Sequence, residues 1–254
     1  MVTILTRRRL IGSLGVGAGS LILSGCDRIS ASPSVQHALG LGQDLTYRAQ
    51  RLLSDRTALA PEFAASDMSP NFRTNGNIMP ASETYQVHAA QRFSNWQLVV
   101  DGLVRRPLTL SLARIRAMPT RTQITRHDCV EGWSAIGKWT GLPLKLLLDA
   151  AGTLTAARYV VFHCADDFGG DSYYESIDLI DAYHRQTILA WAMNDQLLSV
   201  GHGAPLRLRV ERQLGYKQAK YVMRVELVDS LARIGSGNGG YWEDSAGYQW
   251  YAGI

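Results

Sequence analysis

The chain has 254 residues, of which 46% are hydrophobic and 19% are charged, a composition typical of a globular protein and unlike that of a disordered chain. With only three cysteines it is not a disulfide-dense scaffold. The formal net charge of +4 falls close to neutral once Arg7, Arg8 and Arg9 are set aside, so the sequence lacks the basic footprint of a nucleic-acid-binding protein.

Residues 1–26 have the layout of an export signal, with a basic start, an apolar stretch over residues 10–23 and a small-residue end. Residues 6–11 resemble the twin-arginine motif, whose pathway carries folded, cofactor-loaded proteins. Residues 23–26 resemble a lipobox, in which Cys26 would carry lipid; an ordinary signal or membrane anchor is the alternative. The apolar stretch is shorter than the roughly 20 residues of a membrane span. We therefore expect a periplasmic or otherwise extracytoplasmic protein that meets the membrane only through such a lipid anchor.

Residues 27–69 predict a linker followed by an N-terminal helical segment, because leucines recur there at roughly helical spacing. Prolines with asparagines between them predict a long loop over residues 61–82. Further along, Asp101 and Gly102 lie between β-prone residues and predict a hairpin.

The middle of the chain alternates between short predicted strands and short predicted helices. Helices are predicted at residues 111–118, 143–151 and 178–184, the second with Pro143 in its first turn and Gly152 at its end. Strands are predicted at residues 120–125, 158–164, 187–193, 197–200, 205–210 and 220–228. An acidic stretch over residues 166–175 predicts a solvated loop, because it lacks the alternation of a calcium-binding loop. The mixture indicates an α+β fold with β-rich mixed sheets and short helices.

One stretch is better suited to hold a ligand than to pack a core. Residues 126–134 read Arg-His-Asp-Cys-Val-Glu-Gly-Trp-Ser, and residues 139–144 read Trp-Thr-Gly-Leu-Pro-Leu. A cysteine in a short loop beside cationic residues suits a soft or borderline metal. We expect Arg126 and His127 to lower the pKa of Cys129 by favouring the thiolate.

This pattern resembles the molybdenum-ligand loop of the sulfite oxidase fold family, in the branch that contains the bacterial protein-methionine-sulfoxide reductase catalytic subunits. The resemblance implies that residues 70–254 form a molybdopterin-binding oxidoreductase domain. It further implies a molybdenum–molybdopterin cofactor, with Cys129 as the metal ligand and catalytic residue.

The resemblance also assigns cofactor contacts in three other places. An anionic phosphate requires fixed cations and backbone N–H donors, and the family holds its pterin and phosphate in stretches that match residues 202–207 and 215–220. The early loop, residues 71–76, matches less closely, because the sequence departs from the family pattern after Phe72. The third place is Cys164, which stands where the family has a threonine that touches the cofactor. The implied contacts are Arg73, Thr74, Asn75, Cys164, His202, Arg207, Gln218, Ala219 and Lys220.

Two alternatives compete for the cysteines. Cys129 and Cys164 could pair as a structural disulfide in an oxidising compartment. A zinc site could use His127, Cys129, His163 and Cys164. However, His163 and Cys164 are adjacent on a predicted strand, so their side chains point to opposite faces.

The resemblance implies oxygen-atom transfer, most plausibly the reduction of a small or protein-borne sulfoxide. No sequence pattern for haem or iron–sulfur ligation is present, so we expect a separate electron-transfer partner, a haem protein. We expect no nucleic-acid partner, and a monomer, since there is no room for the family's dimerisation domain after Lys220. One alternative is oxidation of sulfite or a related oxyanion, which needs arginines facing the metal, with Arg126 as the nearest. The other is a non-enzymatic exported lipoprotein that carries the Cys129 to Cys164 disulfide.

Overall fold

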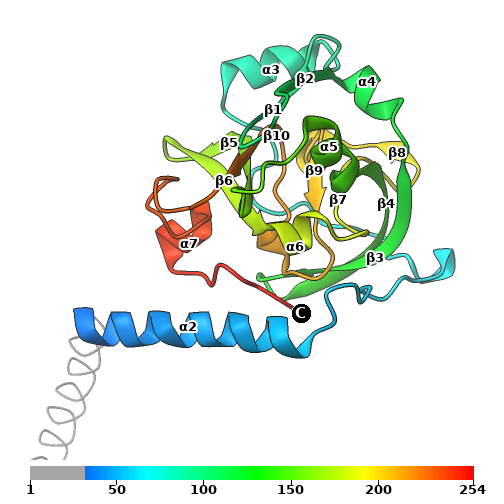
Figure 1. The fold of residues 1–254 in the computed structure, drawn as a ribbon. Helices are drawn as coiled ribbons and strands as arrows, with labels where there is room; N and C mark the ends of the chain where they lie inside the picture. The colour runs from blue at the N-terminus through cyan, green and yellow to red at the C-terminus, as the bar shows by residue number, and fades with distance from the viewer. Residues whose placement is uncertain (1–31) are drawn as a thin grey trace, which may run out of the picture. The chain divides into compact units, whose positions relative to one another are not determined.

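The computed structural model describes residues 32–254, so the predicted export signal lies outside the described residues. The chain divides into two units, Met1–Ser54 and Asp55–Ile254 (Figure 1). In the first unit, α2 (Pro33–Leu53) is a single helix that begins with its proline in the first turn, as helix starts often do. It corresponds to the helical segment expected from the leucine spacing. No helix within residues 32–254 combines the length and apolar character needed to cross a bilayer.

The first sheet of the second unit has five strands, in the order β2-β1-β10-β5-β6. β1 runs parallel to β10, and the other neighbours are antiparallel. The strands are β1 (Gln97–Gly102), β2 (Leu108–Ser111), β5 (Tyr159–Phe168), β6 (Asp171–Asp178) and β10 (Val222–Val228).

The second sheet is antiparallel and follows the order β3-β4-β7-β8, with β9 paired to β7. Its two long strands, β3 and β4, curve along one side of the unit (Figure 1). The strands are β3 (Arg121–Cys129), β4 (Trp133–Pro143), β7 (Ile188–Met193), β8 (Gln196–Leu197) and β9 (Arg207–Arg209).

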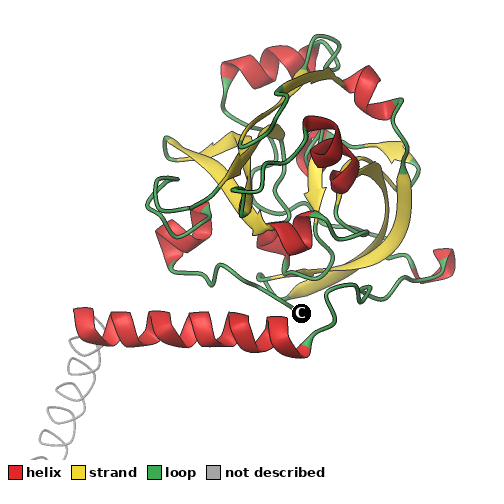
Figure 2. Ribbon diagram, viewed as in Figure 1, coloured by secondary structure: helices red, strands yellow, loops and turns green. Residues whose placement is uncertain are grey.

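Short helices connect the strands and lie around the sheets (Figure 2). Ser82, Ser111 and Asp178 cap three of them by accepting a backbone N–H, which satisfies a donor that the first turn leaves free. The helices are η1 (Ala65–Asp67), α3 (Glu83–Ala90), α4 (Leu112–Arg116), α5 (Leu144–Ala151), α6 (Leu179–Ala182), η2 (Val200–His202), η3 (Gly215–Lys217) and α7 (Tyr241–Ala246).

The main core gathers apolar side chains from both sheets and from α5. The predicted helix at residues 143–151 is confirmed as α5, although Pro143 is its N-cap rather than its first residue. α5 ends at Gly152, whose φ of 73° is the left-handed conformation that glycine adopts without a steric penalty. Leu144, Leu147 and Leu148 are fully buried on one face of α5. The helix predicted from the sequence therefore packs into the main core of the α+β fold.

Two local predictions are wrong. Asp101 and Gly102 do not turn a hairpin, because they are the last residues of β1 and pair with Glu226 and Leu227 of β10. The acidic stretch over residues 166–175 is not a solvated loop. It forms the β5–β6 hairpin, which turns at residues 169–170.

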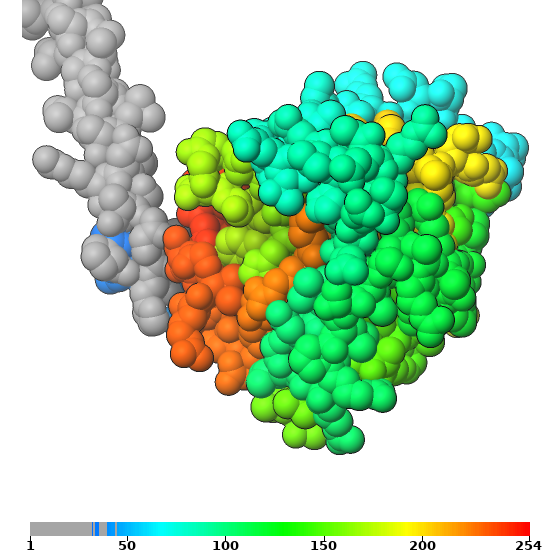
Figure 3. All heavy atoms as spheres, turned by 90° about the horizontal axis from the view of Figure 1, so that it is seen from above, coloured from blue at the N-terminus to red at the C-terminus, as the bar shows by residue number. Residues whose placement is uncertain are grey.

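The loop of residues 61–82 packs over the second sheet, with Phe72 buried in a small cluster that includes Trp139 and Ala204. Figure 3 shows this loop beside the segment that follows β8. His202 Nε2 lies 3.1 Å from the carbonyl oxygen of Phe72, which ties the two segments together. These contacts bring three stretches of the predicted site into one region: the early loop around Phe72, the Trp139 stretch and residues 202–207.

Candidate active site

Cys129 is the last residue of β3, where the chain turns into β4. The turn closes through the Gly132 N–H, which donates to the carbonyl oxygen of Cys129 at 3.1 Å. Side chains alternate along β3, so His127 and Cys129 are buried on one face. The short loop predicted around Cys129 is therefore a hairpin turn, with the cysteine fixed at the end of a strand.

The expected lowering of the Cys129 pKa is wrong. Burial raises the pKa of this thiol, with Arg207 opposing the shift. Arg126 lies on the other face of β3, where its Nε donates to Asp128 at 3.0 Å. Burial also lowers the pKa of His127 well below its ordinary value, so its ring is uncharged. Neither sequence neighbour therefore supplies positive charge to the thiol.

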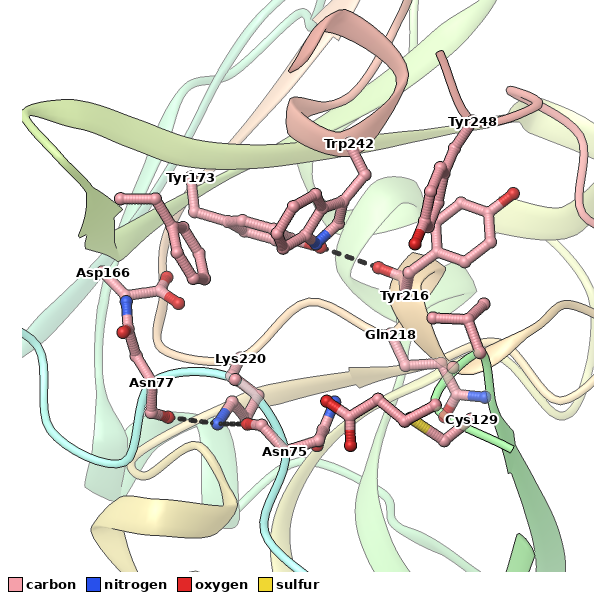
Figure 4. Close-up of a pocket in the computed structure, with 15 residues that line it drawn as sticks. Asn75, Asn77, Cys129, Asp166, Tyr173, Tyr216, Gln218, Lys220, Trp242 and Tyr248 are labelled. Atoms are coloured by element: carbon pink, nitrogen blue, oxygen red, sulfur yellow. Dashed lines mark hydrogen bonds between the residues drawn. The ribbon is translucent and has the colours of Figure 1, made fainter. Parts of the chain in front are cut away.

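Cys129 lines a cavity of about 180 Å³ (Figure 4). Its walls come from residues 75–77, the β3–β4 turn, the β5–β6 hairpin and segments beyond residue 214. The aromatic residues Phe168, Tyr173, Tyr216, Trp242 and Tyr248 supply much of the lining. The cavity thus joins a thiol to segments that are far apart in sequence.

Arg207 is a buried cation that forms no ion pair with any carboxylate among residues 32–254, although Glu211 acts on it electrostatically. Its guanidinium lies over the Trp139 ring at 5.3 Å, and only its Nη1 makes a hydrogen bond, a long one of 3.4 Å to the His202 carbonyl oxygen. Within the described part of the chain, its Nε and Nη2 have no hydrogen-bond partner. Burial lowers the pKa of Arg207 to about 9. A buried guanidinium in this state indicates that an anion completes the site.

Lys220 adds a second buried cation. Its Nζ donates to the carbonyl oxygens of Asn75, at 2.6 Å, and of Asn77. No carboxylate among residues 32–254 forms an ion pair with it, and burial lowers its pKa to about 7. Arg207 acts electrostatically on both Lys220 and His202. Burial lowers the pKa of His202, so Arg207 and Lys220 supply the positive charge that suits a phosphate, with the His202 ring beside them.

The predicted contacts divide into two groups. Asn75, Gln218 and Lys220 line the cavity with Cys129, whereas the other six do not. Arg207 and His202 belong to the second group but act electrostatically with Lys220. All nine assignments stay predictions. Arg73 and Thr74 are exposed, whereas Cys164 and Ala219 are buried.

Both alternative uses of the cysteines are wrong. Cys129 and Cys164 are each free and buried, so they do not form a disulfide. Among residues 32–254, no group of three or more histidine, cysteine or carboxylate side chains is placed to hold a metal ion, which removes the zinc and calcium readings.

Several cavity residues were not singled out from the sequence. Asp166 is 4% exposed, and its side chain points into the cavity (Figure 4). Tyr216, Trp242 and Tyr248 form the wall opposite the loop of residues 75–77. Their signal was the density of aromatic residues near the C-terminus, which shows that a segment packs but not where.

A buried ionic cluster supports this wall. Lys217 follows Tyr216 in η3 and forms ion pairs with Glu175 of β6 and Glu243 of α7, the second at 2.6 Å. All three side chains are fully buried. The cluster therefore ties η3 and α7, which both carry cavity residues, to the first sheet.

Comparisons with known proteins agree with this geometry. Residues 84–233 match the oxidoreductase molybdopterin binding domain. The chain is 38% identical over 235 residues to a putative protein-methionine-sulfoxide reductase subunit, YedZ1, of Azospira oryzae, across 92% of this chain and 83% of that protein. It is 29% identical over 187 residues to the protein-methionine-sulfoxide reductase catalytic subunit MsrP of Campylobacter jejuni, across 68% of this chain and 63% of that protein.

A solved structure shares the fold. The sulfane dehydrogenase SoxCD from Paracoccus pantotrophus superimposes with a TM-score of 0.52 at 21% identity, over 60% of this chain and 41% of that chain. The residues also fit the cofactor. A thiol at one side of the cavity suits a thiolate-bound metal. Beside it, Lys220 and the Arg207 guanidinium, two of whose nitrogens lack partners among residues 32–254, suit a phosphate. The chain belongs to the oxidoreductase molybdopterin-binding domain family and is a molybdenum-cofactor enzyme.

Proposed function

We propose that this protein reduces a sulfoxide-like substrate at a molybdenum held by the Cys129 thiolate. The observation that carries the proposal is the shared cavity, in which Cys129 lies with Lys220, next to the unpaired guanidinium of Arg207. When bound, the cofactor supplies two-electron oxygen-atom transfer. The relatives named as protein-methionine-sulfoxide reductases support the direction of the reaction.

Each residue has a defined part in this proposal. Cys129 holds the metal, and Arg207, Lys220 and His202 hold the phosphate, because all three are fixed by burial or by backbone contacts. Gln218 and Asn75 position the pterin from the cavity wall. Reduction of a sulfoxide to a sulfide and water consumes two electrons and two protons. Because the sequence carries no pattern for haem or iron–sulfur ligation, we propose that the electrons come from a separate partner subunit, a haem protein.

The lining favours a neutral sulfoxide over an oxyanion. Arg126, the arginine nearest to Cys129 in sequence, lies on the opposite face of β3 and pairs with Asp128. Aromatic rings line much of the cavity, and so does Glu131, two residues after Cys129. Aromatic rings attract sulfur-containing side chains, whereas carboxylates repel sulfite. An arginine-lined anion pocket for sulfite oxidation is therefore not supported.

We also propose that the protein works outside the cytoplasm as a monomer, exported by the twin-arginine pathway and anchored through lipid on Cys26. The pattern of residues 1–26 and the names of the relatives support this location. Cell fractionation of the wild type beside Cys26→Ala tests it. The wild type should be found in the membrane fraction, and the variant should be found in the soluble fraction.

The central experiment compares the two buried free cysteines. Wild type, Cys129→Ser and Cys164→Ser are purified from a host that loads molybdoenzymes. Metal content, the Mo(V) resonance and turnover of a methyl sulfoxide with an artificial electron donor are then measured. We expect one molybdenum per chain in the wild type, an altered resonance with lost turnover in Cys129→Ser, and a near-normal Cys164→Ser.

Three results would contradict the proposal. If the wild-type protein contains no molybdenum, the proposed metal centre is wrong. If the Mo(V) resonance of Cys129→Ser is unchanged, Cys129 is not the metal ligand. Sulfite oxidation with an artificial acceptor, in the absence of sulfoxide turnover, reverses the direction of the reaction.

A further inference from the structure

Asp166 is a buried carboxylate that the proposed function does not use. It lies on β5, lines the cavity and is 4% exposed. Among the described residues, its Oδ1 is buried and has no hydrogen-bond partner. A buried carboxylate oxygen that accepts no hydrogen bond is unfavourable, so the free Oδ1 indicates that something else donates to it.

The position of Asp166 separates it from the metal ligand. Figure 4 shows Asp166 and Cys129 at opposite sides of the cavity, with Lys220 between them. Whatever reaches both residues must therefore extend across the cavity. A group bound beside Asp166 is not the group bound to the thiol.

Aromatic rings surround this end of the cavity. Phe168 and Tyr173 pack with ring centroids 5.9 Å apart, and Phe168 and Trp242 with centroids 5.3 Å apart. All three residues line the cavity with Asp166. Ring faces bind planar heterocycles, and a carboxylate accepts hydrogen bonds from their N–H edges. The combination suits a planar ligand with adjacent N–H donors.

We propose that Asp166 recognises the pterin by accepting hydrogen bonds from its amino-pyrimidinone edge. That edge presents a ring N–H and an amino N–H side by side, so that two donors face the two oxygens of one carboxylate. Asp166 thereby sets the orientation of the end of the cofactor that lies far from the metal. The inference depends on the cofactor and not on the substrate.

The electrostatics agree with a ligand that donates hydrogen bonds. Burial raises the pKa of Asp166 to about 7, the Asp167 carboxylate adds to the shift, and Lys220 opposes it. The charge of Asp166 also raises the pKa values of four neighbouring groups, Tyr85, Tyr173, Tyr221 and Cys164. Charge-assisted N–H donors would favour the ionised form and offset the burial.

The test compares Asp166→Asn with Asp167→Asn. Asp167 is the next residue of β5, is only partly buried and does not line the cavity, which makes it a matched control. In loaded protein, the rate of cofactor loss is followed by the fluorescence of released, oxidised pterin and by molybdenum content. We expect Asp166→Asn to lose the cofactor about tenfold faster than wild type or more, as for the loss of one charged hydrogen bond, and Asp167→Asn to match wild type.

A second readout uses protein made without cofactor. Removing a buried carboxylate that lacks partners should raise the melting temperature of Asp166→Asn at about pH 8, while Asp167→Asn should leave it unchanged. Asp166→Ala serves as a second variant if Asp166→Asn does not accumulate. Equal cofactor retention in the Asp166 and Asp167 variants overturns the proposal. So does a less stable cofactor-free Asp166→Asn, or full retention with turnover lost, which would place Asp166 at the reaction instead.

Discussion

Replacing Lys217 by Met should destabilise the protein severely, because it leaves two buried carboxylates without their cation. Lys217 joins Glu175 and Glu243, and all three side chains are fully buried. Removing one partner of a buried ion pair costs about 3–5 kcal/mol. That loss is a large fraction of the roughly 5–15 kcal/mol that stabilises a whole domain.

The loss should depend on pH with a defined sign. Burial and the Glu243 carboxylate raise the pKa of Glu175 well above its ordinary value of 4.5, against the opposing effect of Lys217. Without Lys217, only the hydrogen bond from the Ser176 N–H still opposes that rise. An acid with a raised folded-state pKa holds its proton more tightly when folded, so its destabilising effect is absent below about 4.5 and grows as pH rises. The penalty of Lys217→Met should therefore be small near pH 4 and larger at pH 8.

Urea unfolding of cofactor-free protein at about pH 4.5 and pH 8 measures this dependence. Lys138→Met is the matched control, because Lys138 is partly exposed and pairs with an exposed Asp195, which predicts a loss below about 1 kcal/mol. Adding Glu243→Gln to Lys217→Met should recover about 1–2 kcal/mol at pH 8, since it removes one unpaired charge. A loss that does not change with pH, or no recovery in the double variant, would refute the reasoning.

Other consequences concern the cavity and its support. Burial lowers the pKa of Lys220 to about 7 from 10.5, so the cofactor-free protein should gain about 1 kcal/mol or more of stability as pH rises from 7 to 10. Urea unfolding should show that Lys220→Met lacks this gain. Trp139 is fully buried beneath Arg207 and Arg209, with the Arg209 guanidinium 4.2 Å from the ring centroid; Trp139→Leu should lose about 2–4 kcal/mol in urea unfolding. A thiol assay on denatured, cofactor-free Cys26→Ala protein should detect both Cys129 and Cys164, and fewer than two thiols would contradict their free state.

The predictable parts of the fold are those with local causes. Pro143 and Gly152 mark the ends of α5, because each acts through its own backbone preference. The β5–β6 hairpin was missed although two consecutive glycines form its turn. Acidic side chains suggested solvent exposure, yet Glu175 is buried because Lys217, far along the chain, neutralises it. Such a partner cannot be located from local pattern.

The site likewise divides into features that local sequence predicts and features that depend on residues far along the chain. The motif around Cys129 and the position of Lys220 were found from the sequence, and both line the cavity. The sign of the Cys129 pKa shift was wrong, because Arg126 points to the opposite face of β3. His127 shares the face of Cys129, but burial keeps its ring uncharged, so burial decides the pKa of the thiol. Trp242 and Tyr248 reach the cavity because α7 is anchored to the first sheet through the Lys217 cluster, a tertiary cause with no local signal.

The buried charges of the cavity also bear on how the protein is made. Within residues 32–254, Arg207 and Asp166 each carry buried polar atoms without hydrogen-bond partners, and the hydrogen bonds of Lys220 go to carbonyl oxygens. These groups weaken the cofactor-free protein, whereas a ligand that binds only the folded state at 1,000 times its Kd stabilises it by about 4 kcal/mol. Loading and stability are therefore linked through the same residues. A protein with this linkage is more stable once its cofactor is bound, which agrees with the export that we propose for residues 1–26, by a pathway that carries folded, cofactor-loaded proteins.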